Sequence, residues 1–302
     1  MIASDRKPSS EQAATSTDWK QRSYPLRLDR SEARKFLNFM EMLPTHKRVL
    51  ILGSSPELRD GAFITDKRVC CIDDSLSRLE SMRQNMKYGR YAVDEQLMEC
   101  DLTKMNEKEK FDLILCDETL NRIPLHLWDS VMDQILDRLA DSGYVVMKTL
   151  CCAPRGYFDE IECAEDIWTK WTESELSGDA GYLMVHLMAY WSASREDEEE
   201  SISWRKVMEQ MDTTQRAMVG MDIECDSPFW CRTDEELRRM LEQKGFYLED
   251  VHYGDDNADK FKFSPIYVLG KQSYRIGGDA RKLVTGDDEM TMQNRLSNWG
   301  VW

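Results

Sequence analysis

The sequence lacks several features that would place it in a large class at once. No apolar run approaches the length needed to span a membrane, and the amino terminus has no apolar signal-peptide segment. None of the nine cysteines stands in a Cys-x-x-Cys spacing, so the pattern does not indicate a zinc site. We therefore expect a cytoplasmic protein with reduced cysteines, no membrane partner and no bound metal.

Basic residues are also in deficit. Lys and Arg total 40 against 56 Asp and Glu, which gives a formal charge of −16. Such a chain is a poor electrostatic match for nucleic acid or an anionic membrane. Its 302 residues, 41% of them hydrophobic, suffice for one large α/β core or a core with a lid. The balance therefore favours a small-molecule partner.

Glycine is scarce at the turn around which the chain is organised. The segment Arg48–Asp74 reads RVLILGSSPELRDGAFITDKRVCCIDD. Its two short apolar runs, Val49–Leu52 and Val69–Ile72, are typical of buried strands in a parallel sheet. The turn between them has Gly53 but no second or third glycine, which a pyrophosphate needs for close backbone approach. A dinucleotide is therefore a poor ligand for this turn.

The acidic residues of the same segment favour another ligand. Asp73 follows Gly53 by 20 positions, at the tip of the second strand, where a carboxylate can accept hydrogen bonds from both ribose hydroxyls. Glu57 would repel a phosphate but suits an ammonium group. A ligand with adenosine, no phosphate and a cationic amino-acid end is S-adenosylmethionine. The alternative is an ordinary α/β crossover with a solvated Glu57.

The rest of the chain alternates strands and helices up to about residue 150. Further strands are predicted at Gln96–Leu102, Phe111–Asp117 and Tyr144–Leu150, and a final strand pair at Phe246–Tyr253 and Phe263–Gly270. Helix N-caps are predicted at Ser31, Ser75 and Thr233, with Gly245 closing the last helix, and the Ser75 helix is expected to run to about Lys87. This pattern predicts five regions: a disordered tail (1–22), a cofactor-binding half (23–150), a helical cap insert (151–232), a helix and strand pair completing the sheet (233–272), and a C-terminal extension (273–302).

The insert breaks the alternating pattern. It is too long for a plain loop and is predicted to form helices at roughly 157–175, 180–195 and 201–219. The acidic run 195–200 is most simply a solvated surface. The insert holds five tryptophans, Trp168, Trp171, Trp191, Trp204 and Trp230. They predict either a lid over an apolar acceptor or the core of a helical subdomain.

The motifs VLILGSSPE, CIDDS, ECDL and FDLILCD stand in register, followed by a helix and a closing strand pair. In this the chain resembles the class I S-adenosylmethionine-dependent methyltransferases over about 45–150 and 233–272. Within that family it is most similar to a bacterial-type subgroup with an LG-x-[ST]-PEL-R first motif and a D-x-x-LN-x-[LI]-P stretch, here Leu52–Arg59 and Asp117–Pro124. The resemblance implies an α/β fold: a seven-stranded, mostly parallel, doubly wound Rossmann-like sheet, with the helical insert outside it.

The resemblance also implies roles for individual residues. The turn at Gly53 would wrap the methionine portion of the cofactor, Asp73 would bind the ribose, and Asp101 with Leu102 would contact adenine. Ile51 stands where the family often has an acidic residue, so Glu57 is the substitute partner of the ammonium group. The full set of cofactor-binding candidates is Gly53, Ser54, Ser55, Glu57, Asp73, Asp74, Asp101, Leu102 and Asp117.

The candidate catalytic residues are fewer. Methyl transfer is an in-line displacement from an activated donor, so the protein mainly supplies alignment and a dry pocket, and no fixed catalytic motif is expected. Asp117 and Glu118 would face the methyl group and the substrate; Glu118 and His186 are the candidate general bases. His186 and His126 are lone histidines, for which a structural or solvated role is the alternative. Asn121 either holds its loop through bonds to backbone or belongs to the site.

Three functions remain open at this point. The first is a methyltransferase of a small-molecule acceptor. The second is a methyltransferase of a protein or RNA, with the insert as docking surface. The acidic balance argues against an RNA acceptor. The third is a non-catalytic methyltransferase-like binding or assembly subunit, which the missing acidic residue and glycines favour. Calorimetry with S-adenosylmethionine separates the third from the others, and salt-dependent RNA binding separates the second from the first.

Overall fold

The computed structural model describes most of the chain between residues 27 and 271. The described residues are 27–91, 94–105, 109–154, 157, 160–161, 164–173, 180–193, 201–209, 211–213, 216, 228–253 and 262–271. The predicted tail (1–22), the C-terminal extension (273–302) and the acidic run 195–200 lie outside these ranges.

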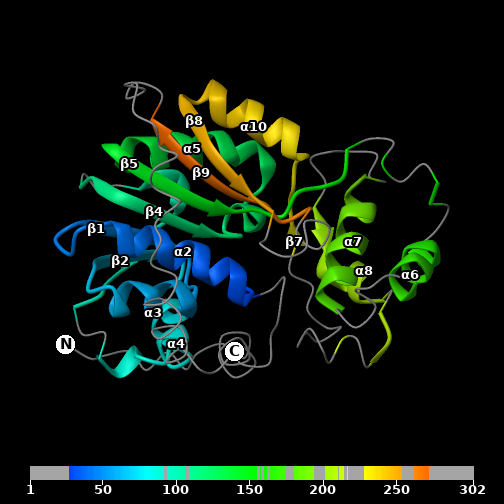
Figure 1. The fold of residues 1–302 in the computed structure, drawn as a ribbon, viewed down its shortest axis with the longest axis horizontal. Coiled ribbons are helices and arrows are strands. Elements are labelled where there is room, and N and C mark those ends of the chain that lie inside the picture. The colour runs from blue at the N-terminus through cyan, green and yellow to red at the C-terminus, as the bar shows by residue number, and fades with distance from the viewer. Residues whose placement is uncertain are drawn as a thin grey trace, which may run out of the picture.

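The framework is a seven-stranded sheet in the order β3-β2-β1-β4-β5-β9-β8 (Figure 1). Strands β1 to β5 are parallel, while β9 runs antiparallel between β5 and β8. The strands are β1 (Arg48–Leu52), β2 (Arg68–Asp73), β3 (Gln96–Glu99), β4 (Phe111–Asp117), β5 (Leu139–Lys148), β8 (Phe246–His252) and β9 (Ile266–Lys271). The predicted α/β class, with a mostly parallel Rossmann-like sheet, is confirmed. Because β1 lies between β2 and β4, the winding reverses there, and the carboxyl ends of these strands form the switch point of the fold.

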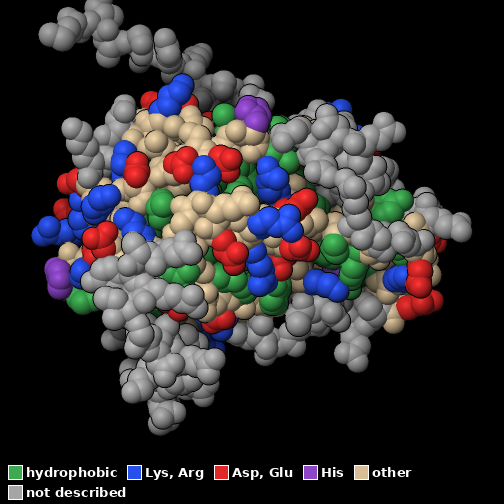
Figure 2. All heavy atoms as spheres, turned by 90° about the horizontal axis from the view of Figure 1, so that it is seen from above, with side chains coloured by type: hydrophobic (Ala, Val, Ile, Leu, Met, Phe, Trp, Pro, Cys, Tyr) green, Lys and Arg blue, Asp and Glu red, His purple; other side chains and the backbone are tan. Residues whose placement is uncertain are grey.

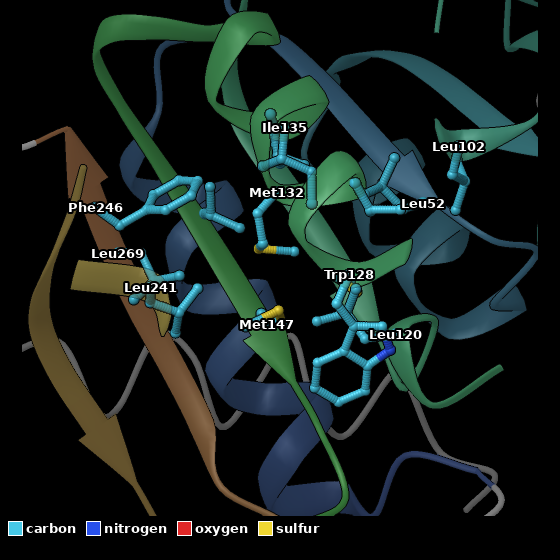
Figure 3. Packing of buried hydrophobic residues seen from close by; sticks show 14 of the residues in the cluster. Leu52, Leu102, Leu120, Trp128, Met132, Ile135, Met147, Leu241, Phe246 and Leu269 are labelled. Atoms are coloured by element: carbon cyan, nitrogen blue, oxygen red, sulfur yellow. The ribbon is translucent and has the colours of Figure 1, made fainter. Parts of the chain in front are cut away.

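Helices cover both faces of the sheet. Helices α2 (Arg30–Met42), α3 (Pro56–Ile64) and α4 (Leu76–Arg83) pack on one face. Helices α5 (Leu125–Arg138) and α10 (Asp234–Gln243) pack on the other, with the short 3₁₀ turn η3 (Leu102–Lys104) at its edge. Figure 3 shows this second core, in which Trp128 of α5 is fully buried and donates from Nε1 to the Ile123 carbonyl at 2.7 Å. Two further 3₁₀ turns are η2 (Gly89–Tyr91) and η4 (Leu120–Arg122).

Local capping explains where several helices begin. Helix α2 starts at Asp29 rather than at the predicted cap Ser31, because Asp29 and Glu32 satisfy each other's backbone donors in a capping box. The predicted caps at Ser75 and Thr233 are confirmed, and Thr233 forms the same reciprocal box with Glu236. The last helix closes as expected at Gly245, whose φ is +91°.

Other predicted boundaries were also wrong. Helix α4 ends at Arg83 instead of about Lys87, because the Asp60 carboxylate captures the backbone N–H groups of residues 87 and 88. Strand β3 stops at Glu99 because the chain turns into η3. Strand β5 starts at Leu139 instead of Tyr144, with an irregular register against β4.

The insert forms a helical unit with its own apolar core. Its elements are α6 (Ala164–Thr172), α7 (Ala180–Ala193), α8 (Trp204–Glu209) and the strand pair β6 (Ile202–Ser203) and β7 (Pro228–Phe229). The first and third helices are shorter than predicted. Figure 1 shows this unit beyond the carboxyl ends of β4 and β5. The core includes Trp171, Leu183, Leu187, Val207 and Phe229. Over the described part of the chain, no helix combines the length and apolar character that a bilayer crossing needs.

Candidate functional site

The turn after β1 is fixed from two sides. Gly53 adopts φ +94°, in the left-handed region that favours glycine, and its N–H donates to the Ile72 carbonyl of β2 at 2.7 Å. From the loop after β4, the Thr119 hydroxyl donates to the Leu52 carbonyl at 2.6 Å. A Cβ added at Gly53 would lie 3.0 Å from that hydroxyl oxygen. The turn is thus held at the centre of the switch point.

The residues after Gly53 carry one hydroxyl toward β4 and one buried carboxylate. Ser54 is half-buried, while Ser55 is buried and donates to Asp117 Oδ2 at 3.1 Å. Glu57 is buried as well, and its Oε1 receives Arg27 Nε at 2.5 Å. The alternative of a solvated Glu57 is therefore wrong, and an ammonium ligand would have to share this carboxylate with Arg27.

Asp73 and Asp74 differ sharply although they are adjacent. The Asp73 side chain is buried at the end of β2, where it accepts from the Ser75 backbone N–H at 3.1 Å and from Arg78 at 2.8 Å. Burial raises the pKa of Asp73 to about 7, although the Arg78 charge opposes the rise. The Asp74 side chain is 72% exposed and shares Arg78 at 2.9 Å. Of the two, Asp73 is therefore the buried carboxylate at the carboxyl end of β2.

The region after β3 places a polar and an apolar residue side by side. Asp101 is exposed and caps η3, and it accepts from both the hydroxyl and the backbone N–H of Thr103, at 2.7 and 2.9 Å. The Thr103 hydroxyl bond is the main reason that the pKa of Asp101 is lowered. Leu102 is buried against the core. The Asp101 carboxylate thus has a local structural task, and its exposed position leaves it accessible.

The end of β4 carries a buried acidic pair that meets a buried lysine. Lys148, at the end of β5, is fully buried, and its Nζ lies 2.9 Å from Glu118 Oε1, 3.1 Å from Glu32 Oε2 and 4.0 Å from Asp117 Oδ1. Burial raises the pKa of Asp117 and of Glu118, and it raises that of Glu32 to about 8, with the Lys148 charge opposing each rise. Sequence reasoning found the acidic pair but missed Glu32 and Lys148.

Glu118 also has an unusual backbone. Its φ is +54°, which is rare for a residue with a side chain, and its N–H donates to the Lys148 carbonyl at 3.0 Å. Such strained positions persist only where the surroundings hold them, and they are concentrated at functional sites. The expected place of Asp117 and Glu118 at the end of β4 is therefore also the place where the backbone is strained.

Asn121 ties the insert to this edge. Its side-chain amide donates to the Leu150 and Trp230 carbonyls at 2.8 Å each, and its Oδ1 accepts from the Leu150 N–H at 3.0 Å. Leu150 stands where the chain leaves the sheet, and Trp230 where it returns. Asn121 therefore does bond to backbone, and it holds both ends of the insert three residues from Glu118.

His186 lies inside the insert rather than among the acidic residues. Its Nδ1 is 3.0 Å from the Tyr182 carbonyl, its ring is tilted by 36° against that of Tyr182 at 3.9 Å between centroids, and it meets Phe263 edge-on at 5.2 Å. Phe263 in turn accepts from the Cys151 N–H at 2.8 Å, just after β5. These contacts pack the His186 ring between Tyr182 and Phe263.

The charges of the site suit a cationic ligand. The turn after β1 is flanked by the carboxylates of Glu57, Asp73 and Asp117, and each has a cationic side chain within 4.0 Å: Arg27, Arg78 and Lys148. The carboxylates disfavour a phosphate, and an ammonium or sulfonium group would share them with these partners. The residues present therefore fit S-adenosylmethionine. On the face that Figure 2 presents, acidic and basic side chains are interspersed. Within the described ranges, no three His, Cys, Asp or Glu side chains gather as metal ligands.

The comparisons with known proteins agree on the fold. No family model matches the chain, and the search of curated proteins gives no match. A Rhodobacter sphaeroides protein, provisionally described as a Zn-dependent alcohol dehydrogenase, superposes with a TM-score of 0.53 at 14% identity, covering 85% of this chain and 98% of its own.

Two methyltransferases are also among the similar structures. An S-adenosylmethionine-dependent methyltransferase from Clostridium acetobutylicum has a TM-score of 0.49 at 13% identity, covering 81% of this chain and 92% of its own. The Burkholderia thailandensis 1,6-didemethyltoxoflavin-N1-methyltransferase, with bound 1,6-didemethyltoxoflavin and S-adenosylhomocysteine, has a TM-score of 0.47 at 12% identity, covering 90% and 93%. At such identities the likeness concerns the fold alone.

Proposed function

We propose that this protein is an S-adenosylmethionine-dependent methyltransferase that acts on a small-molecule acceptor. One observation carries the proposal: the switch point brings the left-handed Gly53 turn, the buried Asp73 and the Asp117 side chain, which is 8% exposed, to the carboxyl ends of three neighbouring strands. Ligands of such sheets bind at this edge. The acidic surroundings favour a cationic, phosphate-free ligand over a dinucleotide.

In this proposal each part of the edge has its own task. The turn at Gly53–Ser55 approaches the amino-acid end of the cofactor with its backbone, and Asp73 accepts the ribose hydroxyls. Asp101 and Leu102 offer an acceptor and an apolar surface to the adenine. The bound cofactor supplies an activated methyl group on a positively charged sulfur.

The reaction then requires mainly alignment and exclusion of water from the protein. Asp117 places a negative charge on the side of the turn where the methyl group would lie, held there by the Ser55 hydroxyl. Glu118, next to it, is the side chain placed to take a proton from the acceptor. The insert (151–232) acts as the cap over the acceptor side, which its own core and its attachment at Asn121 support.

The first test is cofactor binding measured by calorimetry. We expect S-adenosylmethionine to bind the purified protein and Asp73→Ala to weaken binding by about 1 to 3 kcal/mol, the cost of losing charge-assisted hydrogen bonds. Glu80→Ala is the control, because this carboxylate of α4 is exposed and is not among the cofactor-binding candidates. Equal losses in the two folded variants would remove the ribose assignment.

The second test concerns the insert. Tyr190→Ala, in α7, should lower acceptor turnover while cofactor affinity stays within about tenfold, or about 1.4 kcal/mol. Tyr91→Ala is its control, because this tyrosine is 51% exposed and lies outside the insert. A loss of cofactor affinity in Tyr190→Ala with the fold intact would contradict the cap assignment.

A second candidate function is a methyltransferase-like binding subunit without catalysis. The ion pairs of Glu57 with Arg27 and of Asp73 with Arg78 favour it, since both carboxylates already have cationic partners. If neither S-adenosylmethionine nor S-adenosylhomocysteine binds, this candidate replaces the first.

A further inference from the structure

Four ionisable side chains from three elements meet at the ends of β4 and β5. We name them the carboxylate–lysine cluster: Glu32, Asp117, Glu118 and Lys148. Glu32 comes from α2, so the helix before the first strand reaches across to the carboxyl edge of the sheet. All four side chains are at most 10% exposed, and those of Glu32 and Lys148 are at most 1% exposed.

The cluster has more acidic groups than its one ammonium can neutralise. With all four groups ionised it carries two negative charges, and with one proton bound it carries one. A buried unpaired charge is costly, so such a site holds a proton where it can. Glu32 Oε1 is buried and accepts no hydrogen bond from the described residues. This oxygen can therefore carry the proton.

The other groups that face the cluster leave this surplus in place. Arg122 lies near enough to Glu118 to favour its charge, and the Ser55 hydroxyl donates to Asp117. Asp29 lies on the Glu32 side, where its N–H donates to Glu32 Oε2 at 2.8 Å while its own carboxylate adds negative charge. Each of the three acidic groups has a pKa raised by burial.

The cluster is also continuous with the proposed cofactor site. Ser55 belongs to the turn after β1 and contacts Asp117 directly. A cation placed at that turn would therefore act on the same carboxylates that share the proton. All three carboxylates lie within 4.0 Å of the Lys148 Nζ, so a charge placed beside one of them acts on the whole cluster.

We propose that the carboxylate–lysine cluster holds one exchangeable proton, releases it when a cationic methyl donor binds beside Asp117, and regains a proton from the acceptor during methyl transfer. This inference rests on the proposed function and deepens it. It assigns Glu118 as the proton acceptor, with Glu32 and Lys148 as positioning residues that set its charge.

The atoms balance as follows in this step. The acceptor atom forms a bond to the methyl carbon with its lone pair, and the carbon–sulfur bond breaks with its electron pair left on sulfur. The proton of the acceptor passes to Glu118. Glu118 can hold this proton because the positive charge on sulfur has been lost. The acceptor class is therefore one that arrives protonated: an alcohol, a phenol, or an N–H group.

The first experiment counts protons by calorimetry in buffers of different ionisation enthalpy, at about pH 6.5, where the ligand's own α-amino group stays protonated. S-adenosylmethionine and S-adenosylhomocysteine both carry the ribose, so either ligand would release the same proton from Asp73. The two ligands differ in the charge on sulfur, so a difference in proton release reports on that charge. We expect about half a proton or more of additional release with S-adenosylmethionine. Equal counts for both ligands would overturn the inference and leave the proposed function standing, whereas absence of binding would overturn the proposed function itself.

The second experiment starts from the protein without ligand. The infrared spectrum of the free protein at the same pH should show a protonated carboxyl band. This band should weaken in Glu32→Gln, and part of it should remain in Asp73→Asn. If Glu32→Gln fails to fold, the wild-type protein still decides: no protonated carboxyl band in the free protein, or a band that S-adenosylmethionine leaves unchanged, overturns the inference.

Discussion

Asn121 provides a sharp test of how the insert is joined to the sheet. Its buried side chain makes three hydrogen bonds, two to the carbonyls of Leu150 and Trp230 and one from the Leu150 N–H. Asn121→Ala removes all three and leaves the backbone groups without partners. At about 1 to 1.5 kcal/mol for each bond, we expect a loss of about 3 to 5 kcal/mol in the free energy of unfolding.

The assay is urea unfolding followed by circular dichroism, together with limited proteolysis of the insert. Because both bonded segments are ends of the insert, cleavage within 151–232 should rise more than cleavage within β1 or β4. Asn121→Asp should be at least as damaging at neutral pH, since it sets a carboxylate against two carbonyl oxygens.

The control is Asn85→Ala, because the Asn85 amide meets only the Met82 sulfur among the described residues. We expect that control to change stability by less than about 0.5 kcal/mol. A loss below about 1 kcal/mol in Asn121→Ala, or one equal to the control, would show that the three bonds do not hold the insert in place.

Three further predictions follow from the site. Gly53→Ala should lower the free energy of unfolding by about 1 to 2 kcal/mol, because it places a side chain at φ +94° and against Thr119; urea unfolding would contradict this if the two proteins were equally stable. Glu32 has a folded-state pKa of about 8 against an ordinary value of 4.5, so the folded protein binds the extra proton and stability falls as pH rises between these values. This group should contribute about 1.4 kcal/mol of loss per pH unit, and Glu32→Gln should flatten the stability curve measured from about pH 5 to 8, whereas parallel curves would refute the assignment. Methyl transfer to an identified acceptor should be unchanged by a chelator, and activity restored only by magnesium would require Asp117 and Glu118 to be reassigned as metal ligands.

The local signals in the sequence were enough for the framework. Apolar runs bounded by charge predicted β1, β2 and β4 closely, and Thr233 and Gly245 marked the limits of α10. These features depend on neighbours within a few residues, so the chain reports them directly. The turn at Gly53 and the carboxylates at the strand tips could likewise be placed at the switch point, since parallel strands end at the same edge.

The partners of those carboxylates could not be read in the same way. Arg27 pairs with Glu57 across 30 residues, and Glu32 meets Lys148 although more than a hundred residues separate them. Backbone bonding was one of two alternatives that the sequence left open for Asn121, and nothing local showed that Trp230 would be one of its partners. Each of these contacts exists because the order of strands in the sheet brings distant segments together.

The sequence and the tertiary structure therefore determine different properties of this protein. Residue type and spacing along this chain determined which segments become strands and helices, and that acidic groups stand where parallel strands end. Only the tertiary structure decided which of those groups are buried, which already have cationic partners, and which share one lysine. Burial and proximity set the charge of an acidic side chain, and both are properties of the packed molecule. The sequence therefore predicted the edge at which a ligand would bind, and the packing of α2, β4 and β5 determined the electrostatics there.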